Sequence, residues 1–183
     1  LSGSSAASDV YKRQPLDRSS GASIAHHPDV LRLLSVMRAE IEAMRGLTVI
    51  GGAALDLARH SPDEDKVKLD ERASLLIPVI KGWLTERAVT LTSDAVQVHG
   101  GMGFIEETGA AQHYRDSRIL PIYEGTTAIQ ANDLIFRKTL RDSGASVRAL
   151  LAEMEADLIG LDDRLAAPMR SAIATTHQTL DFL

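Results

Sequence analysis

The chain has 183 residues, of which 44% are hydrophobic and 25% are charged, and its formal net charge is −5. This length suffices for one hydrophobic core of domain size. Both signs of charge are interleaved without a basic face, which argues against a nucleic-acid partner. No apolar run reaches the roughly 18 residues that a membrane span needs. The absence of cysteine excludes disulfides and thiolate chemistry and fits a reducing compartment, so we expect a cytoplasmic protein.

The first 14 residues are rich in Ser, Ala and Gly and have no helical periodicity. They are expected to be either a translated adapter sequence, foreign to the fold, or a disordered N-terminal tail.

A long helix is predicted from about Pro28, because apolar residues then advance by threes and fours. Asp29 supports its first turn, and the pattern continues through small residues to Ala58. The proline and charges of residues 59–65 predict a solvated loop. The apolar stripe consists of Val30, Leu34, Met37, Ile41, Met44 and Thr48.

A second helix is predicted over residues 73–98, with Pro78 either kinking it or marking its regular start. It ends at Gly100 and Gly101, and residues 102–125 are expected to be irregular. The apolar stripe consists of Ala73, Ile77, Ile80, Leu84, Leu91, Ala95 and Val98.

Two further helices are predicted in the last third of the chain. One spans about Thr127 to Arg141 and stops at Gly144. The other follows a heptad rhythm over residues 147–165 and would pack antiparallel on a neighbour. Strand signals are nearly absent, so the sequence predicts an all-α fold, an antiparallel helical bundle.

Residues 119–130, Ile-Leu-Pro-Ile-Tyr-Glu-Gly-Thr-Thr-Ala-Ile-Gln, place one carboxylate, Glu124, before a helix start. Ile122 and Tyr123 would shield it from water on one side, which makes a carboxylate a better base. Thr127 and Gln130 have capping-box spacing, which predicts free amide N–H groups that can hold an oxyanion. Taken alone, a glutamate in this setting is more often a solvated turn residue.

Residues 92–104, Thr-Ser-Asp-Ala-Val-Gln-Val-His-Gly-Gly-Met-Gly-Phe, form a second notable stretch. Its glycines end a helix instead of following a strand, which argues against a dinucleotide-binding loop. A simple C-terminal capping turn is the alternative.

These two stretches, in this order, resemble the C-terminal helical domain of acyl-CoA dehydrogenases over about residues 24–145. Residues 27–34 and 130–138 are similar to the longer-chain subgroup that includes methylthiopropanoyl-CoA dehydrogenase. The resemblance implies this domain over residues 15–145 and the start of an additional helical region over 146–183. The family's N-terminal helical and central β-domains have no counterpart here, so we expect a fragment.

The resemblance also implies a chemistry. Glu124 would be the base that removes the α-proton of an acyl-CoA thioester, FAD would take the β-hydrogen as hydride, and the product would be a trans-2-enoyl-CoA. The backbone N–H of the base and a flavin ribityl hydroxyl would stabilise the thioester oxygen. Gln97, Gly100 and Gly101 would contact FAD, commonly that of a neighbouring subunit. Thr126 would contact the flavin, with a helix cap as the alternative.

Other residues receive structural roles. Arg115, Asp116 and Arg118 resemble the family's Arg-Asp pair and are expected to form an ion pair that fixes the loop. Tyr123 would either shape the acyl pocket or pack as a half-buried aromatic. The six histidines lack metal-ligand spacing, so no metal site is predicted.

Two alternative functions remain open: an acyl-CoA oxidase on the same scaffold and a non-catalytic helical interaction module. The Glu-Gly-Thr run favours an enzyme, because a packing module has no need of that carboxylate. The expected partners are an acyl-CoA substrate, an electron-transfer flavoprotein as electron acceptor and further copies of the chain, since isolated apolar stripes would leave an exposed patch.

Overall fold

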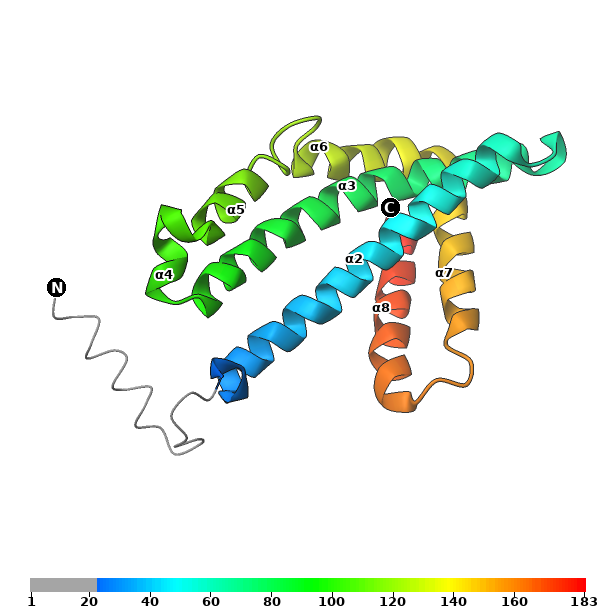
Figure 1. The fold of residues 1–183 in the computed structure, drawn as a ribbon. Helices are drawn as coiled ribbons and strands as arrows, with labels where there is room; N and C mark the ends of the chain where they lie inside the picture. The colour runs from blue at the N-terminus through cyan, green and yellow to red at the C-terminus, as the bar shows by residue number, and fades with distance from the viewer. Residues whose placement is uncertain (1–22) are drawn as a thin grey trace, which may run out of the picture.

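A computed structural model describes residues 23–183 (Figure 1). The predicted tail of residues 1–14 lies outside this range. The elements are η1 (Ile24–His26), α2 (Pro28–His60), α3 (Asp63–Val98), α4 (Gly101–Phe104), η2 (Glu106–Thr108), α5 (Ala110–Ser117), α6 (Thr127–Asn132), η3 (Asp133–Thr139), η4 (Leu140–Asp142), α7 (Ala145–Asp157) and α8 (Asp163–Phe182). No strand occurs among the described residues, which confirms the all-α prediction.

The long helices α2 and α3 form the frame of the molecule, and α5, α6 and η3 pack along α3 (Figure 1). Helix α2 begins at Pro28 as predicted, because proline suits the first helical position. Gly51 allows the two helices to approach closely, since a Cβ there would lie 2.2 Å from Cδ1 of Ile80. The core beside this crossing consists of Ala54, Ala58, Ala73 and Leu76.

The predicted loop of residues 59–65 is wrong, because only Ser61 and Pro62 separate the two helices. Helix α3 starts ten residues before the predicted stripe, at Asp63. Glu64 and Asp65 belong to the first turn of α3, where acidic side chains are favoured by the positive end of the helix. Pro78 lies inside α3 and does not mark its start.

The predicted apolar stripes are only partly buried. In α2 the stripe residues Leu34 and Ile41 are exposed, whereas Leu33 and the small residues near the crossing are buried. In α3 the stripe holds better, because Ala73 and Leu91 are buried, although Ile77 is exposed. Periodicity located the helices correctly but not always the face that packs.

The stretch expected to be irregular contains three short helical elements, α4, η2 and α5. Gly109, with φ of 82°, turns the chain into α5. A hydrogen bond of 2.8 Å between the hydroxyls of Thr92 and buried Ser117 ties the end of α5 to α3. Eight residues with few large apolar side chains carry too little periodicity for detection.

The helix predicted from Thr127 to Arg141 exists but changes its hydrogen-bond pattern. After α6 the chain continues as the π-helix η3, in which the Thr139 hydroxyl donates to the Leu134 carbonyl five residues back. A 3₁₀ turn, η4, ends the segment. Gly144, with φ of 77°, then stops it as predicted.

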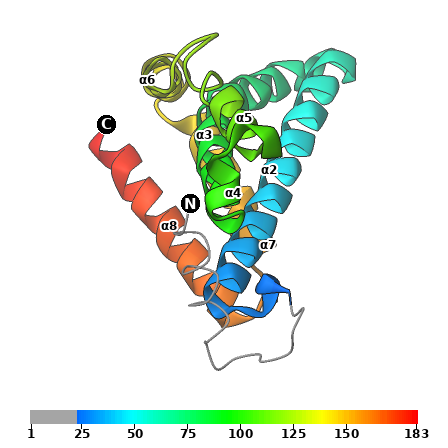
Figure 2. The same cartoon turned by 60° about the vertical axis from the view of Figure 1, so that its left-hand side comes forward.

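The single helix predicted over residues 147–165 is wrong, because the chain turns at 158–162 and returns as α8 (Figures 1 and 2). Gly160 adopts φ of 84° in this turn, and the Asp162 carboxylate caps α8 by accepting a hydrogen bond of 2.9 Å from the Arg164 backbone. Leu158 and Leu161 fitted the heptad but belong to the turn. The hairpin of α7 and α8 has its own core of Leu151, Leu158, Ala166 and Ile173.

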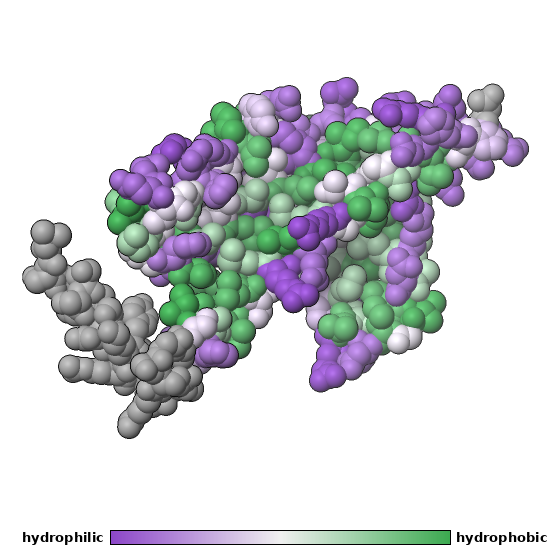
Figure 3. Space-filling model, viewed as in Figure 1, coloured by the Kyte–Doolittle hydropathy of each residue, from purple (hydrophilic) through white to green (hydrophobic). Residues whose placement is uncertain are grey.

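A large apolar surface remains uncovered in this chain. Figure 3 shows hydrophobic side chains at the surface along α2 and around the α7–α8 hairpin. Val49 is 70% exposed and Phe136 is 64% exposed. Within the described part of the chain, no helix is long and apolar enough to cross a membrane.

Candidate functional site

Glu124 lies in the turn that connects α5 to α6, in a strained backbone conformation. Its φ is 54° and that of Gly125 is 92°, so two successive residues are left-handed. Glycine adopts such angles freely, but glutamate does so at a cost of about 1–2 kcal/mol. Among the described residues only Ser143 shares this conformation with Glu124 as a residue other than glycine.

Hydrogen bonds from α6 and within the turn hold this geometry. The Gln130 side-chain amide donates to the Glu124 carbonyl at 3.4 Å, and the Thr127 backbone N–H donates to the Pro121 carbonyl at 3.3 Å. A Cβ on Gly125 would lie 2.6 Å from Nε2 of Gln130. Gly125 is therefore required by its φ, and a side chain there would also displace the end of the Gln130 side chain.

The expected shielding of Glu124 is not formed by the residues that the structure describes. Its side chain is exposed, and the neighbouring Ile122 and Tyr123 are themselves 50% and 45% exposed. None of the hydrogen bonds within residues 23–183 uses the Glu124 backbone N–H. The turn therefore presents outward both a carboxylate and an amide donor.

Helix α6 begins at Thr127 as predicted, but the capping box predicted at Thr127 and Gln130 is displaced by one residue. Thr126 is the N-cap, and its hydroxyl accepts a hydrogen bond of 3.3 Å from the Ile129 backbone. This confirms the capping alternative for Thr126 and leaves its flavin contact a prediction. The amides of Thr127 and Ile129 have partners in the described chain, so these two are not among the free amides that the sequence predicted.

Two residues of α3 fasten the turn to the bundle. The Lys81 ammonium donates to the Leu120 carbonyl at 2.5 Å and lies 5.5 Å from the centre of the Tyr123 ring. Glu86 accepts a hydrogen bond of 2.5 Å from the Thr127 hydroxyl. Neither Lys81 nor Glu86 was found from the sequence, because no local pattern links residues about 40 positions apart.

Gln97 at the end of α3, Gly100 and the first residue of α4, Gly101, are exposed together where the chain turns from α3 into α4. Gly100 has φ of 61° and ψ of −145°, a conformation that essentially only glycine adopts. Gly101 has an ordinary backbone conformation, and a Cβ there would meet no atom within 4 Å. No contact among residues 23–183 therefore requires the absence of a side chain at Gly101.

The structure does not bring the two turns together. The Glu124 turn is fastened at Lys81 and Glu86, whereas Gln97 lies in the last turn of α3 (Figure 1). The eleven residues from Glu86 to Gln97 correspond to about 16 Å of helix. Glu124 and Thr126 are thus one group, and the α3–α4 turn is another.

The ion pair expected among Arg115, Asp116 and Arg118 has a different partner. Arg115 donates two hydrogen bonds, of 2.8 and 3.0 Å, to the Glu106 carboxylate. This contact lowers the pKa of Glu106 and raises that of Arg115, to which Asp116 adds a smaller effect. The pair joins η2 to α5, so it fixes the segment after α4 and not the Glu124 turn.

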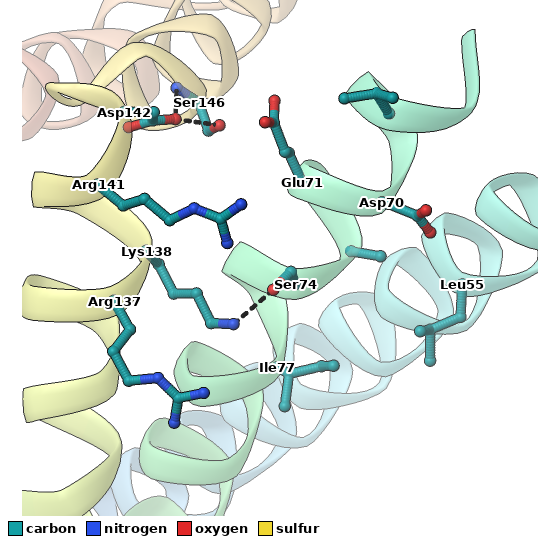
Figure 4. Close-up of a pocket in the computed structure, with 12 residues that line it drawn as sticks. Leu55, Asp70, Glu71, Ser74, Ile77, Arg137, Lys138, Arg141, Asp142 and Ser146 are labelled. Atoms are coloured by element: carbon teal, nitrogen blue, oxygen red, sulfur yellow. Dashed lines mark hydrogen bonds between the residues drawn. The ribbon is translucent and has the colours of Figure 1, made fainter.

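A groove of about 470 Å³ lies elsewhere, where α3 faces η3 and η4 (Figure 4). Arg137, Lys138 and Arg141 line one wall, and Asp70 and Glu71 line the other. The Lys138 ammonium donates to the Ser74 hydroxyl across the groove. With both signs of charge present and no predicted site residue in its lining, the groove does not identify a ligand.

The described residues therefore define an all-α domain that presents a glutamate from a fastened, strained turn. Comparison with known proteins identifies its family: the family model "Acyl-CoA dehydrogenase, C-terminal domain" matches residues 14–139. The chain belongs to the acyl-CoA dehydrogenase family, a family of enzymes that act on acyl-CoA substrates.

Several characterised relatives are similar to this chain. A 3-methylmercaptopropionyl-CoA dehydrogenase of Ruegeria pomeroyi is 48% identical over 97% of the chain and 32% of its own length. A broad-specificity linear acyl-CoA dehydrogenase of Mycobacterium tuberculosis is 36% identical over 73% of the chain and 22% of its length. A butyryl-CoA dehydrogenase of Syntrophomonas wolfei is 32% identical over 72% of the chain and 22% of its own length. The chain thus spans a third or less of the length of these relatives.

Proposed function

We propose that the protein containing this chain oxidises an acyl-CoA thioester to the trans-2-enoyl-CoA, with Glu124 as the base that takes the α-proton. The single observation that supports this role most directly is the strained φ of 54° at an exposed glutamate. A turn that needs only the left-handed angle is better served by glycine. A carboxylate retained there despite strain points to a need for its chemistry.

The residues of the turn can perform the proton-transfer half of the reaction. The Glu124 carboxylate accepts the α-proton, and negative charge then develops on the thioester oxygen. The Glu124 backbone N–H, unused within the described chain, can donate a hydrogen bond to that oxygen. The shielding from water that a base of this kind needs would come from substrate and from parts of the protein beyond this chain.

FAD is the proposed cofactor, and the exposed residues of the two turns fit such a ligand. When bound, it supplies the acceptor for the hydride that leaves the β-carbon. The open space at Gly101 lets a ligand approach the backbone, and the exposed Gln97 amide can both donate and accept. Thr126 accepts one hydrogen bond in its cap and can still donate its hydroxyl proton.

The separation of the two turns bears on how they hold FAD. It supports the arrangement that the family resemblance implies, in which the α3–α4 turn contacts the cofactor of a neighbouring subunit. We therefore include a homo-oligomer in the proposal. We also propose an electron-transfer flavoprotein as the acceptor of the electrons, as in the family.

Anaerobic titration of the full-length protein with a panel of acyl-CoAs, followed by flavin absorbance, tests the proposal. Wild-type flavin should bleach, and Glu124→Gln should lower the rate of bleaching at least about 100-fold while flavin stays bound. Glu107→Gln is the matched control, because Glu107 is also an exposed glutamate but lies in η2. A Glu124→Gln protein that bleaches at the wild-type rate would refute the role of Glu124.

Admitting oxygen after bleaching separates the two enzyme classes. Slow reoxidation supports a dehydrogenase, whereas rapid reoxidation with formation of peroxide identifies an oxidase. A full-length protein that binds no flavin would instead favour a helical interaction module.

A further inference from the structure

Lys81 makes its two contacts with the segment that directly precedes Glu124. Its ammonium donates to the Leu120 carbonyl at 2.5 Å and stands over the Tyr123 ring, 5.5 Å from the ring centre. The side chain is partly buried between α3 and the turn. The Lys81 ammonium therefore contacts both the backbone and the aromatic ring of the segment formed by residues 120–123.

General packing does not explain a lysine at this position. A long aliphatic side chain such as methionine would fill a similar volume without removing an ammonium from water or ordering it. Among the ion pairs of residues 23–183 none involves Lys81, so it does not join two elements by charge pairing. Compared with methionine, lysine adds a hydrogen bond to the Leu120 carbonyl and a cation–π contact with the Tyr123 ring.

Without Lys81 the segment before Glu124 would keep only its local hydrogen bonds and the packing of buried Pro121. The backbone N–H groups of Ile122 and Tyr123 both donate to the Ile119 carbonyl, at 3.0 and 3.2 Å. These bonds shape the turn but do not attach it to α3. The hydrogen bond from the Thr127 hydroxyl to Glu86 does attach the chain to α3, but it comes after Glu124 in the sequence.

We propose that Lys81 is a positioning residue, which holds the turn against α3 so that Glu124 keeps its left-handed conformation and its carboxylate is correctly aimed. The inference rests on the proposed function, because aiming matters only if Glu124 is the base. A displacement of about 1 Å in a reacting group can slow a reaction about 100-fold. Lys81 contacts Leu120 and Tyr123, which lie four residues and one residue before Glu124, so loss of these contacts can displace the Glu124 carboxylate by such a distance.

The test compares Lys81→Met, Lys81→Arg and the control Lys138→Met in the full-length flavoprotein. Lys138 is also partly buried and also donates one hydrogen bond of 2.5 Å, to Ser74; it additionally pairs with Asp133 at 4.0 Å, but neither contact is with the turn, so its loss is a demanding control. Two quantities are measured: the rate constant of flavin reduction at saturating acyl-CoA, per bound flavin, and hydrogen exchange at the amides of Ile122 and Tyr123.

We expect Lys81→Met to lower the rate constant about 10- to 100-fold and to speed exchange at both amides. Lys138→Met should change neither quantity, although it loses an equivalent hydrogen bond. Lys81→Arg should recover much of the rate, because arginine also donates to carbonyls and stacks on aromatic rings. Equal rates per bound flavin in the two methionine variants would overturn the inference.

The two measurements separate this inference from the proposed function. If Glu124→Gln still bleaches at the wild-type rate, the proposed function fails, and Lys81 then positions no base. Amide exchange is independent of catalysis and decides whether Lys81 holds the turn. Unchanged exchange in Lys81→Met would overturn the inference even if Glu124 proved essential.

Discussion

Glu124, the residue proposed as the base, opposes the stability of its own turn. Its left-handed φ costs free energy that glycine would avoid, and its exposed side chain makes no hydrogen bond in the described chain that would offset this cost. The neighbouring Gly125 shows the opposite case, because glycine adopts its φ of 92° without strain.

Replacing Glu124 by glycine should therefore leave stability unchanged or raise it by up to about 1 kcal/mol, because relief of about 1–2 kcal/mol of strain exceeds the entropy that glycine adds to the unfolded chain. Glu124→Val should lower stability, because a β-branched residue tolerates this φ poorly. Thermal unfolding of the three proteins decides the question. A glycine variant that melts well below wild type would show that the turn is not strained. The glycine variant should also fail to reduce flavin.

Gly101 and Gly103 lie two residues apart and should respond oppositely to alanine. A Cβ at Gly103 would lie 2.3 Å from the Val96 carbonyl oxygen, so Gly103→Ala should cost about 1–3 kcal/mol of stability. Gly101→Ala meets open space and should not destabilise the fold. If Gly101 faces FAD, the same variant should nevertheless lower flavin occupancy, which absorbance of the purified protein measures. Full occupancy in Gly101→Ala would separate this glycine from the cofactor.

The individual elements differ in how far the sequence predicted them. Long helices such as α2 and α3 repeat their apolar spacing over many turns, so their existence was predicted correctly. The turn at Gly160 and Asp162 was missed because Leu158, Leu161 and Leu165 happened to continue a heptad across it. The family resemblance of a short stretch singled out Glu124, whose role stays a prediction, but the attachment of its turn by Lys81 depends on tertiary structure that no spacing encodes.

Asp142 at the start of α7 should make stability depend on pH. Burial raises its pKa, but hydrogen bonds from the hydroxyl and backbone of Ser146 and from the nearby Gly144 and Ala145 amides outweigh burial, so the pKa lies below its usual value. A carboxyl whose pKa is lower in the folded state stabilises the fold above its unfolded pKa of about 3.9 and loses this effect as pH falls through the folded pKa.

Asp142→Asn isolates this contribution, because asparagine also accepts hydrogen bonds from backbone N–H groups but does not ionise. Wild type should be the more stable protein at pH 5–7, by about 0.5–2 kcal/mol at most. The difference should shrink as the pH falls below about 4. Thermal unfolding between pH 3 and 7 measures it, and a difference independent of pH would assign the effect to packing and not to charge.

At the scale of the whole molecule, the chain buries few of its large side chains. Its two cores are small, and among the described residues no large side chain is less than 2% exposed. The relatives are at least three times as long, which agrees with a surface that other parts of a larger protein cover. Apolar side chains are therefore exposed among the described residues, as the sequence predicted, and the homo-oligomer that would cover them is a proposal.

The 183-residue chain on its own should self-associate through this apolar surface. Leu31 and Val49, both on α2, are 54% and 70% exposed, so lysine at these positions should weaken association without loss of core packing. Ser35→Lys is the matched control, since Ser35 is an exposed polar residue of the same helix. Sedimentation velocity over a range of concentrations measures the association.

We expect the wild type and the control to form larger species as concentration rises. The double variant Leu31→Lys, Val49→Lys should shift toward monomer. A wild-type chain that remains monomeric throughout would show that the exposed surface of α2 needs no cover, and would leave the neighbouring-subunit arrangement of the α3–α4 turn without support from this face.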